Sequence, residues 1–458
     1  MPAPLKLILS LALIVVMAAW VVLPVKFDVL GPRLGIPVIV KPGSTIEISI
    51  KSSLPFWQPN WQMSLALRDQ RIPLTIVATQ MDVAQQIIAA SIPETINSAA
   101  YSLIVSDGEN EVIRPKAVHV LDDFPQQVSI VQMADLPTLG RGDGDQRLQQ
   151  IIDEINIINP DVVLMTGDIA YGGSWDQYHR LLAAMEKINA PVIAAPGNHE
   201  YEGWAGFLTL IGEPYHAVQF GHLQFISLNS GHGRDQLTEA QYRWLKGELD
   251  KLEGHTPIVQ LHHPIHHRPD LRGYLAVHVQ DLVQAFKQLK VPIVLAGHWH
   301  GDAVYDEDGQ DRRDTWYFPG TPYVVTTAAG ADLREKYSSS PLHHGYRLIR
   351  LDKHVLVTYT YDMDGDGFRD ATSSIPMGKL RAVPEDDQAV LVQNELNEFF
   401  PAARVRIKVP GNNLELKPDF GQLVNRYSYK GDSYFEIEVP LSANSQRRIR
   451  LISEGKSL

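Results

Sequence analysis

The sequence predicts an α/β core preceded by a β-sandwich and followed by a small β-rich module. Three observations lead to this fold class. Short β-rich runs without helical periodicity fill residues 34–123, strands and helices alternate over residues 126–362, and the alternation stops over residues 363–458. At 458 residues, the chain is also too long for a single ordinary hydrophobic core.

The first 27 residues carry a targeting signal. After Lys6, the stretch LILSLALIVVMAAWVVL (7–23) has no charged residue and is followed by Pro24. Its length lies between that of a signal-peptide core and that of a minimal membrane span. We therefore predict a signal peptide or N-terminal membrane anchor over residues 1–27. The protein is expected to be exported to the periplasmic or extracellular side, anchored by a single transmembrane helix if the segment is not cleaved.

Residues 34–123 indicate a sandwich of the immunoglobulin or fibronectin type. Runs such as STIEISI and AAYSLIVSD are β-rich, and KPGS and SDGEN are typical turn sequences. From residue 126, runs such as DVVLMT and PVIAAP alternate with helical segments, in one of which Leu148, Ile151 and Ile155 form an apolar stripe. This alternation predicts an α/β layered core.

The net charge and the absence of cysteine exclude one class of function and one means of stabilisation. The formal net charge of −12 argues against a general nucleic-acid-binding protein, because such a protein needs a basic face. The chain has no cysteine, so an exported form has no disulfides to stabilise it.

Over residues 363–458, runs such as ARVRIKV and SYFEIEVPL predict strands, but they indicate no function.

Five predicted core strands end in residues that are typical metal ligands. In chain order these residues are Asp135, Asp168, Asn198 with His199, His262, and His298 with His300. The carboxyl ends of strands in an open α/β sheet face one crevice, so these side chains are expected to converge. Their oxygen and nitrogen donors suit first-row transition metals. A single polar residue after a strand can simply cap the turn or helix that follows it. Five strands in succession that end in ligand-type residues instead predict a metal site.

The order of these motifs resembles that of the calcineurin-like metallophosphoesterases over residues 128–361. The shared pattern is Asp, Gly-Asp, Gly-Asn-His-Glu, His and Gly-His-x-His. The resemblance implies an αββα sandwich with two metals in its crevice. That family usually opens with Asp-x-His, whereas Pro137 occupies the histidine position here. The sequence GDIAY, which ends at Tyr171, instead resembles the Gly-Asp-x-x-Tyr motif of the purple acid phosphatase branch, and VQLH (259–262) resembles its Val-x-x-His motif.

The resemblance implies a ligand set for each metal. Metal one would be held by Asp135, Asp168, Tyr171 and His300, and metal two by Asp168, Asn198, His262 and His298. The implied pair is Fe³⁺ with Fe²⁺, Zn²⁺ or Mn²⁺, and the tyrosine would be a phenolate ligand of the ferric ion. The alternative for Tyr171 is an aromatic packing residue beside the site.

The implied activity is that of an exported phosphohydrolase acting on phosphate esters, first of all phosphomonoesters, through hydroxide held by the metals. His199 is the predicted catalytic residue, placed to protonate the leaving oxygen or to bind a phosphate oxygen, with Glu200 orienting it. The histidine-rich run HHPIHHR (262–268) supplies His266 and His267 as predicted substrate-binding residues. The alternative for this run is a solvated loop.

Two other functions stay open. One is a di-manganese phosphodiesterase that acts on nucleotides or lipid head groups. The other is a cell-surface binding protein in which the β-rich parts bind and the metal centre is structural. The predicted partners are a phosphate-ester substrate, attracted by the metals, and the membrane if residues 1–27 are retained.

A second metal site is predicted in DMDGDGFRD (362–370). Asp362, Asp364, Asp366 and Asp370 stand at positions that resemble the first part of a calcium-binding loop. Ser373 occupies the position where such a loop has a bidentate glutamate. A β-turn with solvated carboxylates is the alternative.

Overall fold

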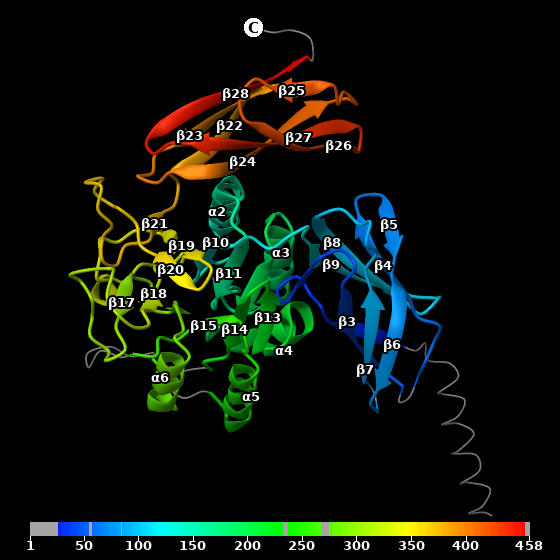
Figure 1. Cartoon of the computed structure of the whole chain (residues 1–458), viewed down its shortest axis with the longest axis horizontal. Coiled ribbons are helices and arrows are strands. Elements are labelled where there is room, and N and C mark those ends of the chain that lie inside the picture. The colour runs from blue at the N-terminus through cyan, green and yellow to red at the C-terminus, as the bar shows by residue number, and fades with distance from the viewer. Residues whose placement is uncertain are drawn as a thin grey trace, which may run out of the picture.

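The computed structural model describes residues 26–453, apart from 55–56, 84, 232–236, 267–273 and 276. It shows an α/β core beside a β-sandwich, with a second β-rich module packed over one end (Figure 1). This arrangement confirms the predicted fold class. The predicted leader or anchor lies almost entirely outside the described residues. Within the described part of the chain, no helix has the length and apolarity needed to cross a membrane.

The N-terminal sandwich starts at Phe27, before the predicted residue 34, because β1 pairs with β3. One sheet has the order β1-β3-β7-β6 and the other β2-β9-β8-β4-β5. Buried and more exposed residues alternate along β3, because successive side chains point to opposite faces, and Ile48 packs with Leu65 and Leu103 of the other sheet. The strands are β1 (Phe27–Gly31), β2 (Val38–Val40), β3 (Thr45–Ser52), β4 (Gln62–Leu67), β5 (Gln70–Pro73), β6 (Thr75–Met81), β7 (Gln85–Ser91), β8 (Ala99–Ser106) and β9 (Glu111–Val120).

A pair of sheets packed face to face forms the core. The first has the order β12-β11-β10-β19-β20, with β21 also pairing with β19, and the second has the order β13-β14-β15-β16-β18-β17. Leu164 of the first sheet and Phe225 and Leu295 of the second share one apolar cluster. The strands are β10 (Gln127–Met133), β11 (Val162–Thr166), β12 (Val192–Ala195), β13 (His216–Phe220), β14 (Leu223–Leu228), β15 (Thr256–Leu261), β16 (Val294–Ala296), β17 (Ala303–Tyr305), β18 (Tyr323–Val325), β19 (Gly345–Asp352), β20 (Val355–Thr358) and β21 (Ile375–Pro376).

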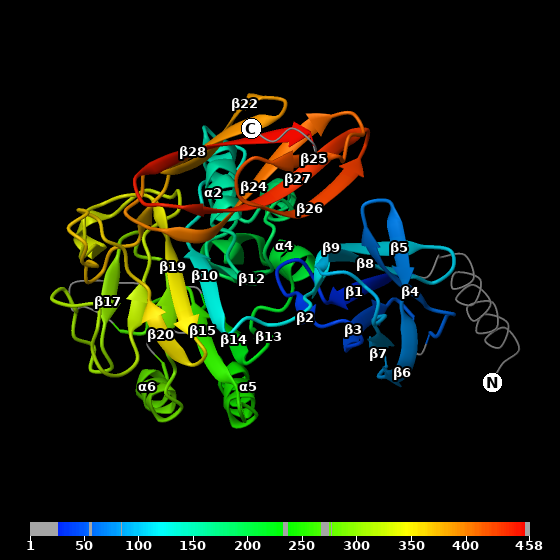
Figure 2. The ribbon, with the colours of Figure 1, turned by 45° about the horizontal axis from the view of Figure 1, so that its top comes forward.

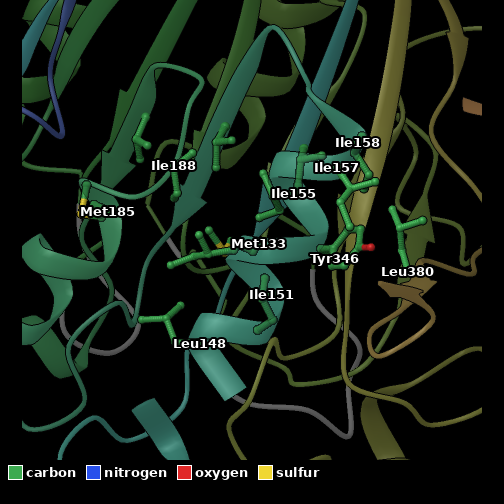
Figure 3. Close-up of a cluster of buried hydrophobic side chains, with 14 of the residues drawn as sticks. Met133, Leu148, Ile151, Ile155, Ile157, Ile158, Met185, Ile188, Tyr346 and Leu380 are labelled. Carbon is green, nitrogen blue, oxygen red and sulfur yellow. The ribbon is translucent and has the colours of Figure 1, made fainter. Parts of the chain in front are cut away.

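Helices cover the outer faces of both sheets. On the first sheet, Leu148 and Ile151 of α2 pack with Met133 of β10 (Figure 3). On the second, Leu245 of α5 and Phe286 of α6 belong to one apolar cluster with strand residues. The helical segments are α2 (Gly144–Ile158), α3 (Trp175–Met185), the 3₁₀ turn η1 (His199–Gly203), α4 (Trp204–Gly206), the π-helix η2 (Phe207–Ile211), α5 (Glu239–Asp250), α6 (Val279–Gln288) and the 3₁₀ turn η3 (Glu335–Tyr337). The layers are therefore helix, sheet, sheet and helix.

The ends of the helices follow from local sequence. Ser174 and Gln177 form a capping box at the start of α3. The hydroxyl of Thr238 accepts from the backbone N–H of Gln241 at the start of α5. Asn159 ends α2 in the left-handed conformation, which asparagine tolerates better than most residues.

The C-terminal module packs on α2 and shares its apolar cluster, in which Val392 and Val405 lie with Ile155. One of its sheets has the order β22-β23-β28-β25 and the other β24-β27-β26. The strands are β22 (Leu380–Asp386), β23 (Ala389–Asn394), β24 (Phe400–Pro410), β25 (Leu416–Pro418), β26 (Gln422–Tyr429), β27 (Asp432–Leu441) and β28 (Ser445–Ser453). Because β21 lies beyond residue 363 and pairs with β19, the sheet of the core extends past the predicted boundary.

Candidate metal centre

The ligand-type residues selected from the sequence lie where core strands end. Strands β10, β11 and β12 run parallel, as do β14, β15 and β16. Parallel strands end at the same edge of their sheet, and the residues that follow them meet above the two packed sheets. The structure brings together Asp135 after β10, Asp168 after β11, His262 after β15, and His298 and His300 after β16.

These five side chains form two groups that share one carboxylate. In the first group, ligand atoms of Asp168, His262 and His298 all lie within 4.8 Å of one another. In the second, the same holds for Asp135, Asp168 and His300. Asp168 alone belongs to both groups, which is the arrangement required of a residue that bridges two cations.

The backbone at this site is held in an unfavourable conformation. Asp135, Asp168, His298 and His300 have φ angles of 54°, 49°, 69° and 55°. Left-handed conformations cost non-glycine residues roughly 1–2 kcal/mol each. Such strain persists only where the surrounding structure enforces it, and it is concentrated at functional sites.

Glycine precedes the ligands because the loops approach one another closely. A Cβ atom on Gly167, whose φ is 79°, would lie 2.4 Å from Nδ1 of His262. A Cβ on Gly197 would lie 2.2 Å from Oδ1 of Asp168. Both contacts are far too short, so the glycine of each motif is a packing requirement of the site.

Burial and charge work against each other within the cluster. The side chains of His262 and Asp135 are fully buried, and that of Asp168 is nearly so. Burial disfavours the imidazolium form of His262, but the Asp168 and Asp135 carboxylates outweigh it and raise its pKa to about 9. Burial, together with the neighbouring His263 and His262, lowers the pKa of His298 well below the usual range. A cation between these carboxylates and imidazoles would replace the proton that they otherwise attract.

The imidazoles are oriented by hydrogen bonds from their outer nitrogens. Nδ1–H of His262 donates to the carbonyl of Thr166 at 3.0 Å, and Nδ1–H of His300 donates to the carbonyl of Asp332 at 2.6 Å. Nε2 of each ring then faces a carboxylate, 3.2 Å from Asp168 for His262 and 3.2 Å from Asp135 for His300. Metal-binding histidines are commonly oriented by such bonds.

Comparison with known proteins agrees with this geometry. Residues 128–302 match the family model described as calcineurin-like phosphoesterase. The 3′,5′-cyclic adenosine monophosphate phosphodiesterase CpdA of Haemophilus influenzae is 30% identical over 220 residues, which are 44% of this chain and 75% of that protein. The chain belongs to the calcineurin-like phosphoesterase family.

Two other proteins are similar to parts of this chain. A probable cyclic nucleotide phosphodiesterase of Rhodococcus erythropolis is 30% identical over 194 residues, which are 37% of this chain and 64% of that protein. Among solved structures, the purple acid phosphatase PPD1 of yellow lupin aligns over 74% of this chain and 73% of its own, with 14% identity and a TM-score of 0.45.

The donor set of this phosphoesterase fits the binuclear metal centre that its family uses. Besides the two groups that share Asp168, Oδ1 of Asp135 is buried and faces two ring nitrogens, Nε2 of His300 at 3.2 Å and Nε2 of His262 at 3.9 Å. A buried carboxylate oxygen of this kind is costly unless a cation balances it. Pro137 is buried and packs against Gly330, so its position offers no ligand.

His199, Asn198 and Tyr171 lie at the rim of this phosphoesterase's cluster. Nε2 of His199 is 3.8 Å from Oδ2 of Asp168, and the backbone N–H of His199 donates to Oδ1 of Asp168 at 2.9 Å. The rings of His199 and Tyr171 stack with centroids 4.0 Å apart, and 40% of Tyr171 is exposed. Asn198 lies in the same turn, next to His199. The roles of Asn198 and Tyr171 as metal ligands stay predictions.

Glu200 holds two ligand loops together instead of orienting His199. It is fully buried, and its carboxylate accepts from the backbone N–H groups of Asp168 at 3.0 Å, Ala170 at 2.9 Å and Gly197 at 2.5 Å. Burial and the nearby Asp168 carboxylate raise the pKa of Glu200 to about 7. The side chain therefore joins the turn after β11 to the turn after β12.

His266, one of the two predicted substrate histidines, is not brought to this cluster. The ring of His266 packs against Tyr323, with centroids 4.4 Å apart, and beside Tyr305. Tyr323 begins β18, which runs parallel to β16, so this contact lies toward the strand starts and away from the ligand edge. His267 lies outside the described residues.

His263 and Ser230 also belong to the site, although the sequence analysis assigned neither of them a function. The ring of His263 lies 4.3 Å from that of His298 and 5.1 Å from that of His262, centroid to centroid. Its Nδ1 is 2.8 Å from the hydroxyl of Ser230, which follows β14. His263 directly follows a predicted ligand, and Ser230 follows a sixth strand end, in LQFISLNS. These two positions, at the ends of predicted core strands, are the sequence features that indicate a place in the site.

The acidic loop after β20 is a compact turn. Asp362, Asp364 and Asp366 have carboxylate oxygens within 4.8 Å of one another. The two oxygens of Asp362 accept from the backbone N–H groups of Gly365 and Gly367 at 2.7 and 3.0 Å. Backbone donors satisfy this carboxylate without an ion, and calcium binding by the loop stays a prediction.

Calcium added to chelated protein is expected to raise the melting temperature if this loop binds it, because a ligand that binds only the folded state stabilises it. The Asp364→Ala/Asp366→Ala variant is expected to lose the shift while unfolding at the same temperature in chelator. Differential scanning calorimetry measures both. An identical calcium shift in parent and variant would place the bound ion elsewhere, and no shift in the parent would leave a plain turn.

Proposed function

We propose that this phosphoesterase hydrolyses phosphomonoesters through a binuclear metal centre held by the residues that follow its core strands. The observation that carries the proposal is the pair of ligand groups sharing Asp168. The Gly-Asp-x-x-Tyr motif and the replacement of the first-motif histidine by Pro137 support the purple acid phosphatase branch. On this proposal, Asp135, Asp168, Tyr171 and His300 hold one metal, and Asp168, Asn198, His262 and His298 hold the other.

When bound, two metals supply a Lewis acid for the phosphate oxygens and a water that deprotonates near neutral pH. The chain itself supplies His199 at the rim. Its side chain is 21% exposed, so it can reach an ester that enters from solvent. Its Nδ1 is buried and has no hydrogen-bond partner among the described residues. The ring, fixed by stacking on Tyr171, can bind a phosphate oxygen or protonate the leaving oxygen.

Replacing His199 with Ala is expected to lower turnover by about 10²–10⁴-fold, the usual contribution of a positioned acid–base group, and to leave both metals bound. Steady-state kinetics and elemental analysis of the same preparation check the two halves of this expectation. The matched control is His179→Ala, an exposed histidine on α3. Loss of one equivalent of metal in the His199 variant would show that this ring is a ligand.

A second candidate function is the hydrolysis of nucleotide phosphodiesters. It is supported by the similar proteins, because the relatives from Rhodococcus erythropolis and Haemophilus influenzae are named as a probable cyclic nucleotide phosphodiesterase and a cyclic adenosine monophosphate phosphodiesterase. A panel of phosphomonoesters, cyclic nucleotides and linear diesters, assayed with iron-, zinc- and manganese-loaded protein, tests both candidates. A kcat/KM that is highest for a monoester supports the first function, and one that is highest for a cyclic nucleotide supports the second. No hydrolysis of any ester would favour the binding-protein alternative.

We further propose that the protein acts outside the cytoplasm. The support is the uncharged segment 7–23 behind Lys6. Fractionation of cells that express the full chain, with the mass of the mature protein, tests both export and cleavage. Full-length protein in the cytoplasmic fraction would overturn this proposal.

A further inference from the structure

A loop of the N-terminal sandwich is built into the catalytic core. We name residues 32–37, between β1 and β2, the docking loop. It is closed by reciprocal hydrogen bonds between the backbones of Arg33 and Ile36, both 3.0 Å. The carbonyl of Gly35 accepts from the backbone N–H of Ala194 in the edge strand β12 at 2.9 Å. β2, which follows the loop, contacts β13 of the core (Figure 2).

The docking loop also packs inside the core. Leu34 is 3% exposed and belongs to the apolar cluster beneath α2 and α3, not to the cluster inside the sandwich. A Cβ atom on Gly35 would lie 2.9 Å from Cγ2 of Ile211 and 3.3 Å from Cβ of Ala194. The loop therefore fills the space between β12 and the π-helix η2, with no room for an additional methyl group.

Arg33 supplies hydrogen-bond donors that η2 lacks. Its side chain is 2% exposed, and its Nη1 donates to the carbonyls of Leu208, at 2.9 Å, and Thr209, at 2.5 Å. The last carbonyls of a helix have no donor within the helix, and buried carbonyls need one. Nε of Arg33 donates to the carbonyl of Val29 at 3.1 Å, and Nη2 pairs with Asp28 at 3.3 Å. A single guanidinium thus joins the sandwich to the end of η2.

The two contact points lie on either side of the catalytic turn. β12 ends at Ala195, Asn198 and His199 follow, and η1, α4 and η2 continue without a break to Ile211. The docking loop holds this segment before the turn, at Ala194, and after it, at Leu208 and Thr209. A shift of either end would move His199 relative to Asp168.

We infer that Arg33 is a positioning residue for His199 and Asn198. The N-terminal sandwich then contributes to activity by fixing the positions of these two residues. The inference rests on the proposed roles of these two residues. A stabilising contact alone would predict loss of folded protein with unchanged turnover per folded molecule. Positioning predicts loss of turnover in protein that remains folded, because a misplacement of about 1 Å can cost on the order of 10²-fold in rate.

The experiment compares Arg33→Met, Arg33→Lys, Gly35→Ala and a control in the full chain. Arg33→Met is expected to lower kcat about 10- to 100-fold with little change in KM, and Arg33→Lys to recover part of the loss. Gly35→Ala adds the excluded methyl without removing charge and is expected to lower kcat in the same way. The control is Arg71→Met, an exposed arginine of the same sandwich paired with Glu111, which is expected to behave as the parent protein.

Hydrogen exchange provides a readout that needs no substrate. Amides of residues 199–212 are expected to exchange faster in Arg33→Met and Gly35→Ala, while those of β15 and β16 keep their protection. This result would support positioning even if the parent hydrolysed no phosphate ester, so failure of the proposed function is distinguished from failure of the inference. Unchanged kcat and unchanged exchange in both variants, or a purely global loss of protection, would overturn it.

Discussion

The Asp168→Asn variant is expected to lose turnover by at least about 10³-fold and to bind both metals more weakly. Metal ions stabilise transition-state charge by several kcal/mol, and this carboxylate is shared by both ligand groups. Asparagine has nearly the same shape, and its oxygen can still accept the 2.9 Å bond from the His199 N–H, so the loop is expected to keep its fold. Kinetics, elemental analysis and thermal unfolding measure the three effects separately.

A matched control lies at the other end of the same strand. Asp161 precedes β11, and its carboxylate accepts from the backbone N–H of Ser129 at 2.7 Å, away from the ligand groups. Asp161→Asn is expected to retain both metals and most of the activity. A full metal complement with near-normal turnover in Asp168→Asn would show that the shared carboxylate is no bridge, and the binuclear arrangement proposed here would be wrong.

The iron-loaded parent protein is expected to be violet or pink, and the Tyr171→Phe variant is expected to lose this colour. A tyrosinate bound to ferric iron gives a charge-transfer absorption, and phenylalanine has no oxygen to bind. Because Pro137 replaces the usual histidine, metal one would retain Asp135, Asp168 and His300 as its protein ligands. Metal one is therefore expected to bind more weakly, while metal two keeps its ligands. Visible absorption and metal titration check the two effects.

The control for this experiment is Tyr201→Phe. Tyr201 lies in η1 with His199, and its hydroxyl donates to Oδ1 of Asn229 at 3.0 Å. Its loss is expected to leave the colour unchanged. A colourless, iron-free parent protein that is fully active with manganese alone would remove the purple acid phosphatase assignment and return Tyr171 to the role of the aromatic residue that stacks on His199. The family assignment would stand, because it does not depend on this tyrosine.

Much of the core and its metal cluster was predictable because the relevant signals are local. Short continuous apolar runs mark the buried parallel strands, and a residue shortly after such a run lies at the carboxyl edge of the sheet. Asp135, Asp168, His262, His298 and His300 all follow this rule, and the structure brings all five together. The apolar stripe that includes Leu148, Ile151 and Ile155 likewise becomes the buried face of α2.

Other features depend on partners that local periodicity does not reveal. The carboxylate of Glu200 accepts from backbone N–H groups of the turn after β11. Every residue except proline has such a donor, so the sequence does not indicate which ones this carboxylate contacts. His266 stands four residues after His262 in the sequence, but β15 ends at Leu261 and the His266 ring packs against Tyr323. Ser230 was overlooked because serine after a strand is ordinary turn chemistry.

The amino-acid sequence alone predicts the order of the three folded parts, the α/β core and the residues that converge at the candidate metal centre. These properties follow from residue chemistry and from spacings of a few positions. How the parts join is visible only in the folded molecule, where Arg33 and Leu34 of the sandwich enter the core and the C-terminal module shares its apolar cluster with α2. Local sequence patterns do not predict these contacts, because they join residues more than a hundred positions apart. Their geometry depends on where each chain segment lies after the sheets have packed.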